Sequence, residues 1–285
     1  MITVDENRNS NISSEHSEEL LNIIENFRLM DDTFMSKVFE DKACAELLLR
    51  VILNRDDLTV VKVVSQFELK NLQGRSARLD IYAVDEHGKQ YDVEVQRSDD
   101  GAAPRRARNN SSLLDANLLN PGDKFDELPE SYIIFITEHD VLKGGKPLYT
   151  VNRTISELDH AIFTDGSHII YVNGEIRNGT ALGELMQDFF CKDPREMHYK
   201  VLSDRADYFK KDKEGVDTMC KLMEDYADKR ARQAAEAAAE KAAKERSISI
   251  ATNLWNKGER DLQQIADLTD LPLDEVKKLF EGKTA

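Results

Sequence analysis

The sequence has few residues of the kinds that cross-link a chain or hold it in a membrane. Its 285 residues include three cysteines and one tryptophan. Cys44, Cys191 and Cys220 are far apart and match no metal-ligand spacing or disulfide framework, so we expect reduced thiols. No apolar run approaches the roughly 20 residues that span a bilayer, and the first residues form no apolar signal core. These absences predict a cytoplasmic protein that contacts no membrane.

Several active-site motifs are also missing. The chain contains no Gly-x-Ser-x-Gly sequence and no visible Ser, His, Asp order. Residues 144–146, Gly-Gly-Lys, do not form a phosphate-binding loop, because Pro147 follows them and the upstream glycine is absent. The six histidines are scattered, and His87 falls in a turn. No histidine is therefore assigned to chemistry.

Positive charge is scarce relative to negative charge. The chain has 39 Lys and Arg residues against 54 Asp and Glu residues, which gives a net charge of −15. A basic groove is the usual mark of a nucleic-acid-binding protein, so this charge lowers the expected affinity for nonspecific DNA. It leaves room for a local positive face, and it predicts that a bound metal would contribute materially to phosphate attraction.

Two alternating runs stand out in what the sequence does contain. Residues 78–96 read RLDIYAVDEHGKQYDVEVQ, in which apolar and polar residues alternate on both sides of a short turn. Alternation with period two predicts two half-buried strands. The turn, residues 86–88, ends in Gly88, which adopts positive φ without steric cost. The segment is therefore predicted to be a β-hairpin.

The turn fixes which residues of the hairpin face each other. Asp85 is expected to pair with Lys89, which places Asp80 opposite Glu94 and puts Gln96 on the same face. A one-residue slip would move the valines of the second strand to the wrong face. Directly opposed Cβ atoms lie about 4.5–5.5 Å apart, so the two carboxylates repel unless a cation lies between them. Mg²⁺ suits such oxygen ligands, and ion pairs with surface cations are the alternative.

These residues resemble the signature of the PD-(D/E)XK nucleases, in which an Asp on one strand is followed by Glu-x-Lys on its neighbour. The chain is similar in particular to the recombination-promoting nuclease/putative transposase branch. Asp80 matches the Asp of the motif and Glu94 its acidic residue, while Gln96 stands where most of the superfamily has Lys. Glutamine is common there in this branch. The similarity continues in three further segments: residues 34–39, 104–108 and 131–137.

The resemblance implies an α/β, restriction-endonuclease-like fold, with a mixed central sheet flanked by helices and an all-α C-terminal extension. It implies a metal-dependent DNA endonuclease associated with mobile elements or recombination, with Mg²⁺ or Mn²⁺ as cofactor and DNA as partner. Asp80 and Glu94 would hold the metal, together with the backbone carbonyl of Val95. Gln96 would position the attacking water, although a neutral amide cannot act as a base.

An arginine cluster begins the helix predicted at residues 104–119. Arg105, Arg106 and Arg108 lie in its first turns, where cations oppose the helix dipole. A DNA phosphate would compensate, since helix N-termini and arginines both favour it. The alternative partners are three neighbouring carboxylates: those of Asp99, Asp100 and Glu94. In the nuclease that the resemblance implies, Arg106 or Arg105 would supply the positive charge that Gln96 lacks.

Glu46 loosely matches an acidic helix residue that some members of the superfamily use near the metal; a solvated glutamate is the alternative. It lies in residues 33–54, which are predicted to be helical with an interruption near Asp41 and a cap at residues 31–32. The other predicted elements are helices at 18–29 and 180–190, a turn at 73–76, and strands at 59–70, 132–136, 148–155 and 168–173. The continuous apolar run at 132–136 predicts a strand buried on both faces.

Four regions are predicted along the chain: a disordered tail at 1–17, the nuclease-like domain at 18–200, a helical extension with an Ala/Glu/Lys-rich spacer at 201–246, and a helix-turn-helix-like segment at 247–285. Asp274 and Glu275 lie beside Lys277 and Lys278 in its second helix. This mixture favours contact with a protein partner or a second copy over DNA reading.

Two other functions remain as alternatives. A catalytically weak or inactive nuclease fold could serve as a DNA- or protein-binding module, which Gln96 and the acidic net charge favour. A carboxylate-pair hydrolase with another substrate has less support, because no sugar-binding aromatic cluster accompanies the hairpin.

Overall fold

The computed structural model describes residues 18–70 and 76–281. This part of the chain forms two compact units, which divide after Lys221. The predicted disordered tail at 1–17 lies outside the described residues, as does most of the turn predicted at 73–76.

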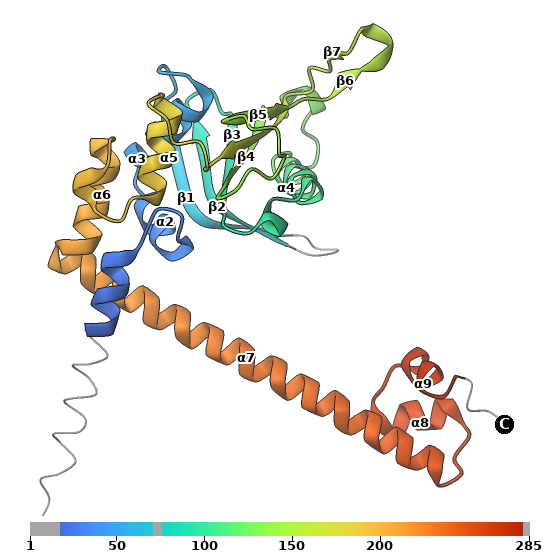
Figure 1. Ribbon diagram of the computed structural model, residues 1–285. Coiled ribbons are helices and arrows are strands. Elements are labelled where there is room, and N and C mark those ends of the chain that lie inside the picture. Colours follow the sequence, from blue (N-terminus) through green and yellow to red (C-terminus); the bar gives the residue numbers. More distant parts are fainter. Residues whose placement is uncertain (1–17, 71–75, 282–285) are drawn as a thin grey trace, which may run out of the picture. The chain divides into compact units, whose positions relative to one another are not determined.

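The first unit is built around a mixed six-stranded sheet with the order β1-β2-β3-β4-β8-β5 (Figure 1). Its strands are β1 (Val60–Leu69), β2 (Ala77–Asp85), β3 (Gln90–Gln96), β4 (Ser131–Thr137), β5 (Leu148–Val151) and β8 (Ser167–Asn173). The first three strands are antiparallel, β3, β4 and β8 run parallel, and β5 is antiparallel to β8. A small separate pair consists of β6 (Thr154–Ile155) and β7 (Ala161–Ile162).

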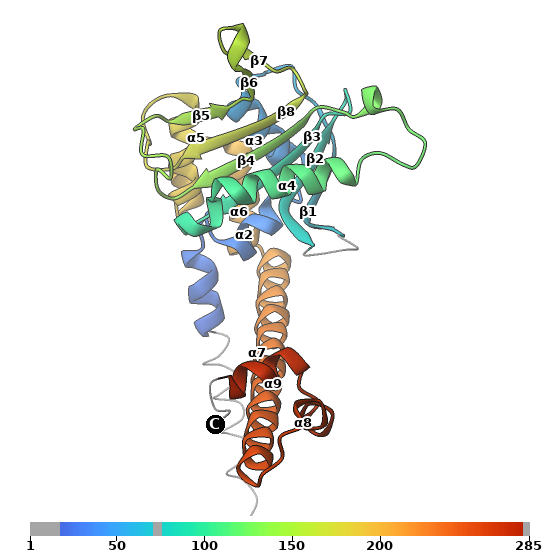
Figure 2. The same cartoon turned by 90° about the vertical axis from the view of Figure 1, so that its right-hand side faces the viewer.

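Helices cover both faces of this sheet (Figure 2). One face is crossed by α4 (Pro104–Ala116), while α3 (Lys42–Leu53) and α5 (Ala181–Phe190) lie on the other. The unit also contains α2 (Asp32–Val38), α6 (Lys200–Lys211), the start of α7 (Lys213–Asn256) and the short η1 (Asp99–Ala102), η2 (Phe125–Glu127), η3 (Ser156–Leu158) and η4 (Pro194–Glu196). Residues 18–26 are also helical. The predicted α/β architecture, a mixed central sheet flanked by helices, is confirmed.

The hairpin between β2 and β3 has the predicted turn and register. The Asp85 amide donates to the Lys89 carbonyl at 3.1 Å, and Gly88 has φ of +78°. Ile81 pairs with Val93 across the two strands. Turn chemistry and hydrophobic alternation therefore specified one register between them.

The prediction that both hairpin strands are half-buried is wrong for β3. Six of its seven residues are buried, and the side chains of Asp92 and Glu94 have no exposed surface. The reason is that β3 lies inside the sheet, between β2 and β4, and α4 covers the face that carries both carboxylates. The predicted burial of β4 is confirmed, since Phe135 and its neighbours pack between the sheet and α4.

The helical segment at 33–54 breaks where expected. Asp41 ends the interruption by capping α3, because its carboxylate accepts hydrogen bonds from the amides of Ala43 at 2.8 Å and Cys44 at 3.2 Å. Asp31 precedes α2 but does not cap it with its side chain. It accepts instead from the Arg28 amide at 2.8 Å.

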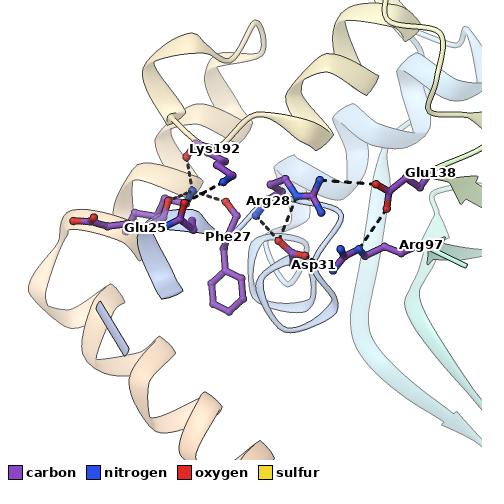
Figure 3. Close-up of polar contacts among 9 residues, drawn as sticks. Glu25, Phe27, Arg28, Asp31, Arg97, Glu138 and Lys192 are labelled. Carbon is purple, nitrogen blue, oxygen red and sulfur yellow. Dashed lines mark hydrogen bonds and ion pairs between the residues drawn. The ribbon is translucent and has the colours of Figure 1, made fainter. Parts of the chain in front are cut away.

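The first unit extends past the predicted boundary at residue 200, because α6 packs against α2 and α3. Lys210 of α6 is only 7% exposed, and its ammonium donates to the carbonyl oxygen of Glu25 at 3.1 Å and to that of Phe27. Figure 3 shows these carbonyl groups beside Lys192. Burial lowers the pKa of Lys210 to about 8. This lysine fixes the end of the helix at residues 18–26 and so the segment that leads into α2.

The second unit consists of helices. It contains the later part of α7 (Lys213–Asn256), followed by α8 (Leu262–Thr269) and α9 (Leu273–Phe280). Trp255 stacks on Phe280 with ring centroids 4.4 Å apart, over a small core that includes Ile265 and Val276. All side chains at 228–246 are exposed, as the absence of large apolar residues predicted. None of the helices in the described ranges is both long and apolar enough to cross a bilayer.

Deleting residues 228–285 is expected to leave the first unit folded, because the deleted segment lies within the second unit and begins with fully exposed side chains. Thermal unfolding followed by circular dichroism should retain a cooperative transition of the first unit. The deletion should lower the free energy of unfolding of the first unit by less than about 1 kcal/mol, which corresponds to a fall in melting temperature of roughly 2–4 °C for a domain of this size. Loss of the cooperative transition would show that the deleted helices stabilise the sheet.

Candidate active site

The hairpin brings Asp80 and Glu94 to adjacent positions under α4. Since Ile81 pairs with Val93, the next position along the ladder places Asp80 of β2 beside Glu94 of β3. The Val95 amide donates to Asp80 Oδ2 at 3.0 Å, which fixes the first carboxylate against the second strand. The predicted juxtaposition of these two acidic residues follows from this geometry.

Both oxygens of Glu94 have donors. Oε2 forms an ion pair with Arg106 and accepts from Gln96 Nε2 at 3.2 Å. Oε1 accepts from Asn110 Nδ2 at 3.4 Å. Arg106 therefore has one of the carboxylate partners expected from the sequence. Its side chain is 38% exposed, whereas that of Glu94 is fully buried.

Gln96 is held between Glu94 and the short helix η1. Its Oε1 accepts from Arg106 Nη1 at 3.2 Å, and the same nitrogen donates to the carbonyl oxygen of Gly101 at 2.9 Å. A Cβ atom at Gly101 would lie 2.1 Å from Gln96 Oε1. The absence of a side chain at Gly101 thus lets the backbone of η1 approach the Gln96 amide, which stays partly exposed.

Two further residues of this cluster were missed by sequence analysis. Asp92, two positions before Glu94 on the same face of β3, is fully buried and accepts from Asn110 Nδ2 at 3.2 Å. Its Oδ1 has no hydrogen-bond partner among the described residues. Asp92 could have been identified from its spacing of two residues from Glu94, which places both on one face of a strand. Asn110 could have been identified because it follows Arg106 by one helical turn.

Asp32, the first residue of α2, also acts on the site, since its negative charge raises the pKa of both Asp80 and Glu94. It accepts from Gln66 Nε2 at 3.2 Å. Gln66 has φ of +54°. It lies on β1 beside the position that Asp80 occupies on the neighbouring strand β2. No local pattern indicated either residue, because both come from other elements of the fold.

An ion-pair network fixes the start of α2 beside the carboxyl ends of β3 and β4 (Figure 3). Asp31 Oδ1 lies 2.9 Å from Arg97 Nη1, and Arg97 Nε lies 3.4 Å from Glu138 Oε2. Arg28 contacts both acidic residues, with Nη1 4.0 Å from Glu138 Oε1. Since Asp31 precedes Asp32, this network also restrains the position of the Asp32 carboxylate.

Burial dominates the electrostatics of the three carboxylates. It raises the pKa of Glu94 to about 8, with a further increase from the charge of Asp80 and an opposing effect of Arg106. It raises the pKa of Asp80 to about 6, against the hydrogen bond from Val95. The pKa of Asp92 is also raised well above its ordinary value, by burial and then by Glu94. The cluster therefore favours protons or a cation over three bare negative charges.

Asp80 and Glu94 meet the minimum that Mg²⁺ requires of a protein. Within residues 18–70 and 76–281, no group of three or more His, Cys, Asp or Glu side chains is arranged to hold a metal ion. Mg²⁺ commonly binds through one or two carboxylates and keeps several waters, so two adjacent carboxylates fit this ion. The Arg106 guanidinium already contacts Glu94 Oε2, and a cation at that oxygen has to share or displace it.

The structure does not bring every predicted residue to this cluster. Glu46 accepts from the Val60 amide at 2.9 Å and pairs with Arg50 at 2.9 Å, so its carboxylate joins α3 to β1 instead of reaching Asp80. Arg105 and Arg108 are exposed on α4, outside the face that carries Arg106. Both therefore present their charge to solvent.

In metal-free protein, stability is expected to fall as pH rises from about 4.5 to 8. The folded-state pKa of Glu94, about 8, exceeds the ordinary glutamate pKa of 4.5. Folded protein therefore holds a proton that unfolded protein has released. Asp80 adds to the lower part of this range, since its pKa rises from 3.8 to about 6. Glu94→Gln should shrink the fall in melting temperature between pH 5 and pH 8, measured in EDTA.

Glu46→Gln is the matched control, because it removes a carboxylate that lies outside the cluster. It should leave the pH dependence of the melting temperature as in wild type. An unchanged pH dependence in Glu94→Gln would contradict the conclusion that Glu94 holds a proton in the folded protein.

A protein-family comparison matches residues 34–181, just over half of the chain, to a family described as PD-(D/E)XK nuclease family transposase. The match contains the hairpin, η1 and α4, and so includes Asp80, Glu94, Gln96 and Arg106. No curated protein and no solved structure matches the chain.

Proposed function

Because the chain belongs to the PD-(D/E)XK nuclease family transposases, with a restriction-endonuclease-like α/β fold, we propose that it is a metal-dependent DNA endonuclease that hydrolyses phosphodiester bonds. The observation that carries this proposal is the adjacent pair of Asp80, which is half-buried, and Glu94, which is fully buried. Each carboxylate is fixed by its own donors: the Val95 amide for Asp80, and Arg106 with Gln96 for Glu94.

Asp80 and Glu94, with the backbone carbonyl of Val95, would hold Mg²⁺ or Mn²⁺. Such a cation supplies a Lewis acid for the scissile phosphate and lowers the pKa of water at neutral pH. The two carboxyl groups are already assembled and partly desolvated before DNA arrives, and a bound cation would take the place of the proton that burial favours at Glu94. The amide that anchors Asp80 keeps it from turning away.

Gln96 would orient the attacking water. Its side chain is the partly exposed member of the β3 face, whereas Glu94 behind it is buried. The amide can donate to and accept from water, but it carries no charge. Contact with Arg106 and the close backbone of Gly101 restrict the directions in which it points.

Arg106 would supply the positive charge that a lysine provides in most of the superfamily. Its guanidinium is next to Gln96 and Glu94 and is partly exposed, so it can turn toward a phosphate oxygen when a cation takes over Glu94. Arg105 and Arg108 lie exposed on the same helix and would contact the DNA backbone. The net charge of −15 lowers the expected affinity, and the arginine–phosphate contacts predict that binding weakens as salt rises.

The family supports an association with mobile elements or recombination. The second unit would contact a protein partner or a second copy through α8 and α9, whose exposed side chains mix acidic and basic residues. The second candidate function is a weak or inactive nuclease fold that binds DNA or protein. Gln96 in the lysine position and the Arg106–Glu94 ion pair favour it.

Purified wild-type protein is expected to nick supercoiled plasmid DNA in the presence of Mg²⁺ and to stop when EDTA removes the ion. Asp80→Ala should lower the nicking rate by at least about 10²–10³-fold, as loss of one well-placed site group does. Glu46→Gln should nick at the wild-type rate, because Glu46 lies outside the cluster. Equal nicking by wild type and Asp80→Ala would identify a contaminant and favour the binding function.

Gln96→Ala should lower nicking by about 10²–10³-fold at saturating Mg²⁺, through lost positioning of water, with little change in metal affinity. Gln96→Lys should retain or raise activity, since an ammonium orients water and adds charge. Gly101→Ala should imitate Gln96→Ala, because the added Cβ displaces the amide. If Gln96→Ala cuts as fast as wild type while Asp80→Ala is inactive, the role given to Gln96 is wrong.

A further inference from the structure

Asn110 is the second residue of α4 that reaches the buried carboxylates. It is 3% exposed, and its Nδ2 lies 3.2 Å from Asp92 Oδ2 and 3.4 Å from Glu94 Oε1. Positions 106 and 110 are four residues apart and share one face of the helix. Arg106 and Asn110 therefore approach Glu94 from the same helix, one at each oxygen.

A primary amide has the chemistry that this position needs. A carboxylate that holds a cation is ionised and only accepts hydrogen bonds, whereas one NH₂ group carries two donor hydrogens. Asn110 can direct one hydrogen to Asp92 and the other to Glu94, which offsets the repulsion between two buried acids. The opposite orientation of the amide would bring three acceptor oxygens together. A hydroxyl at this position would offer a single donor, and an aliphatic side chain none.

Asp92 determines which end of the Asn110 amide faces the site. It is fully buried, and a buried carboxylate opposes folding unless donors satisfy it. Its Oδ2 accepts from Asn110, while its Oδ1 has no hydrogen-bond partner in the described part of the chain. An acceptor that depends so strongly on one amide holds that amide with its NH₂ group toward β3.

We propose that Asn110 is a positioning residue that fixes the Glu94 carboxylate for cation binding, and that Asp92 orients the Asn110 amide. The inference rests on the proposed function, which assigns the cation to Asp80 and Glu94. Without Asn110, Glu94 Oε1 loses its donor and the carboxylate is free to turn further toward Arg106. A cation then has to reorganise both side chains before it binds.

The test is Mn²⁺ binding to the full chain, measured by titration calorimetry without DNA, so that cleavage plays no part. Asn110→Ala should weaken binding by about 10–100-fold, the usual effect of removing a partner of a metal ligand. Asn109→Ala is the matched control, because Asn109 is the exposed neighbour on the same helix, and it should bind as wild type does. Asp92→Asn keeps an acceptor for the amide and should stay closer to wild type than Asn110→Ala.

Thermal unfolding of each variant separates positioning from stability alone. A folded Asn110→Ala protein with wild-type Mn²⁺ affinity overturns this role and leaves the proposed function intact. If Asn110→Ala does not fold, Asn110→Ser retains one donor and should bind more weakly than wild type; equal affinity overturns the role. If wild type binds no Mn²⁺, or Asp80→Ala binds it equally well, the proposed metal site and the role of Asn110 fail together.

Discussion

The burial of carboxylates inside the sheet is the constraint on which the rest of the site depends. Glu94 and Asp92 lie on a strand with neighbours on both sides and a helix above it. A bare carboxylate in such surroundings is strongly disfavoured, so donors have to be supplied by the elements that cover it. Arg106 and Asn110 are those donors, and both belong to α4. The placement of this helix is therefore an electrostatic requirement as well as a packing one.

The same requirement explains the close fit around Gln96. Its amide shares Glu94 Oε2 with the guanidinium of Arg106, and that guanidinium also binds the backbone of η1. A side chain at Gly101 would force the Gln96 amide to move, so the absence of one allows η1 and the amide to lie this close together. The neutral amide is compatible with this arrangement because it accepts from Arg106 and donates to Glu94.

Features set by local interactions were predictable from the sequence, and those set by distant ones were not. The register of the hairpin followed from Gly88 and the alternation around it, all within one short segment. The polar face of β3 is buried because α4 covers it and because β4 pairs with the strand inside the sheet, and both elements lie outside the hairpin. Alternation alone therefore indicated a half-buried strand.

The site shows the same division between local and distant information. The proximity of Asp80, Glu94 and Gln96 was predictable because one hairpin holds them at fixed spacing. Arg106 was a candidate because arginines cluster at the start of α4. Asn110 is a neutral residue within that helix, and its importance follows only from what lies beneath it. Glu46 loosely matched an acidic helix residue of the superfamily, but its carboxylate accepts from the Val60 amide, a contact that no local pattern indicated.

α4 both packs on the sheet and supplies donors to the carboxylate cluster, which has a consequence for the partly folded chain. Leu113 and Leu114 place this helix on the apolar sheet surface, while Arg106 and Asn110 complete the carboxylate cluster one to two turns earlier. Docking of the helix therefore also assembles the carboxylate cluster. A chain whose α4 has not docked lacks the donors that Arg106 and Asn110 supply to Glu94. Such a chain has the sequence motif without the assembled cluster.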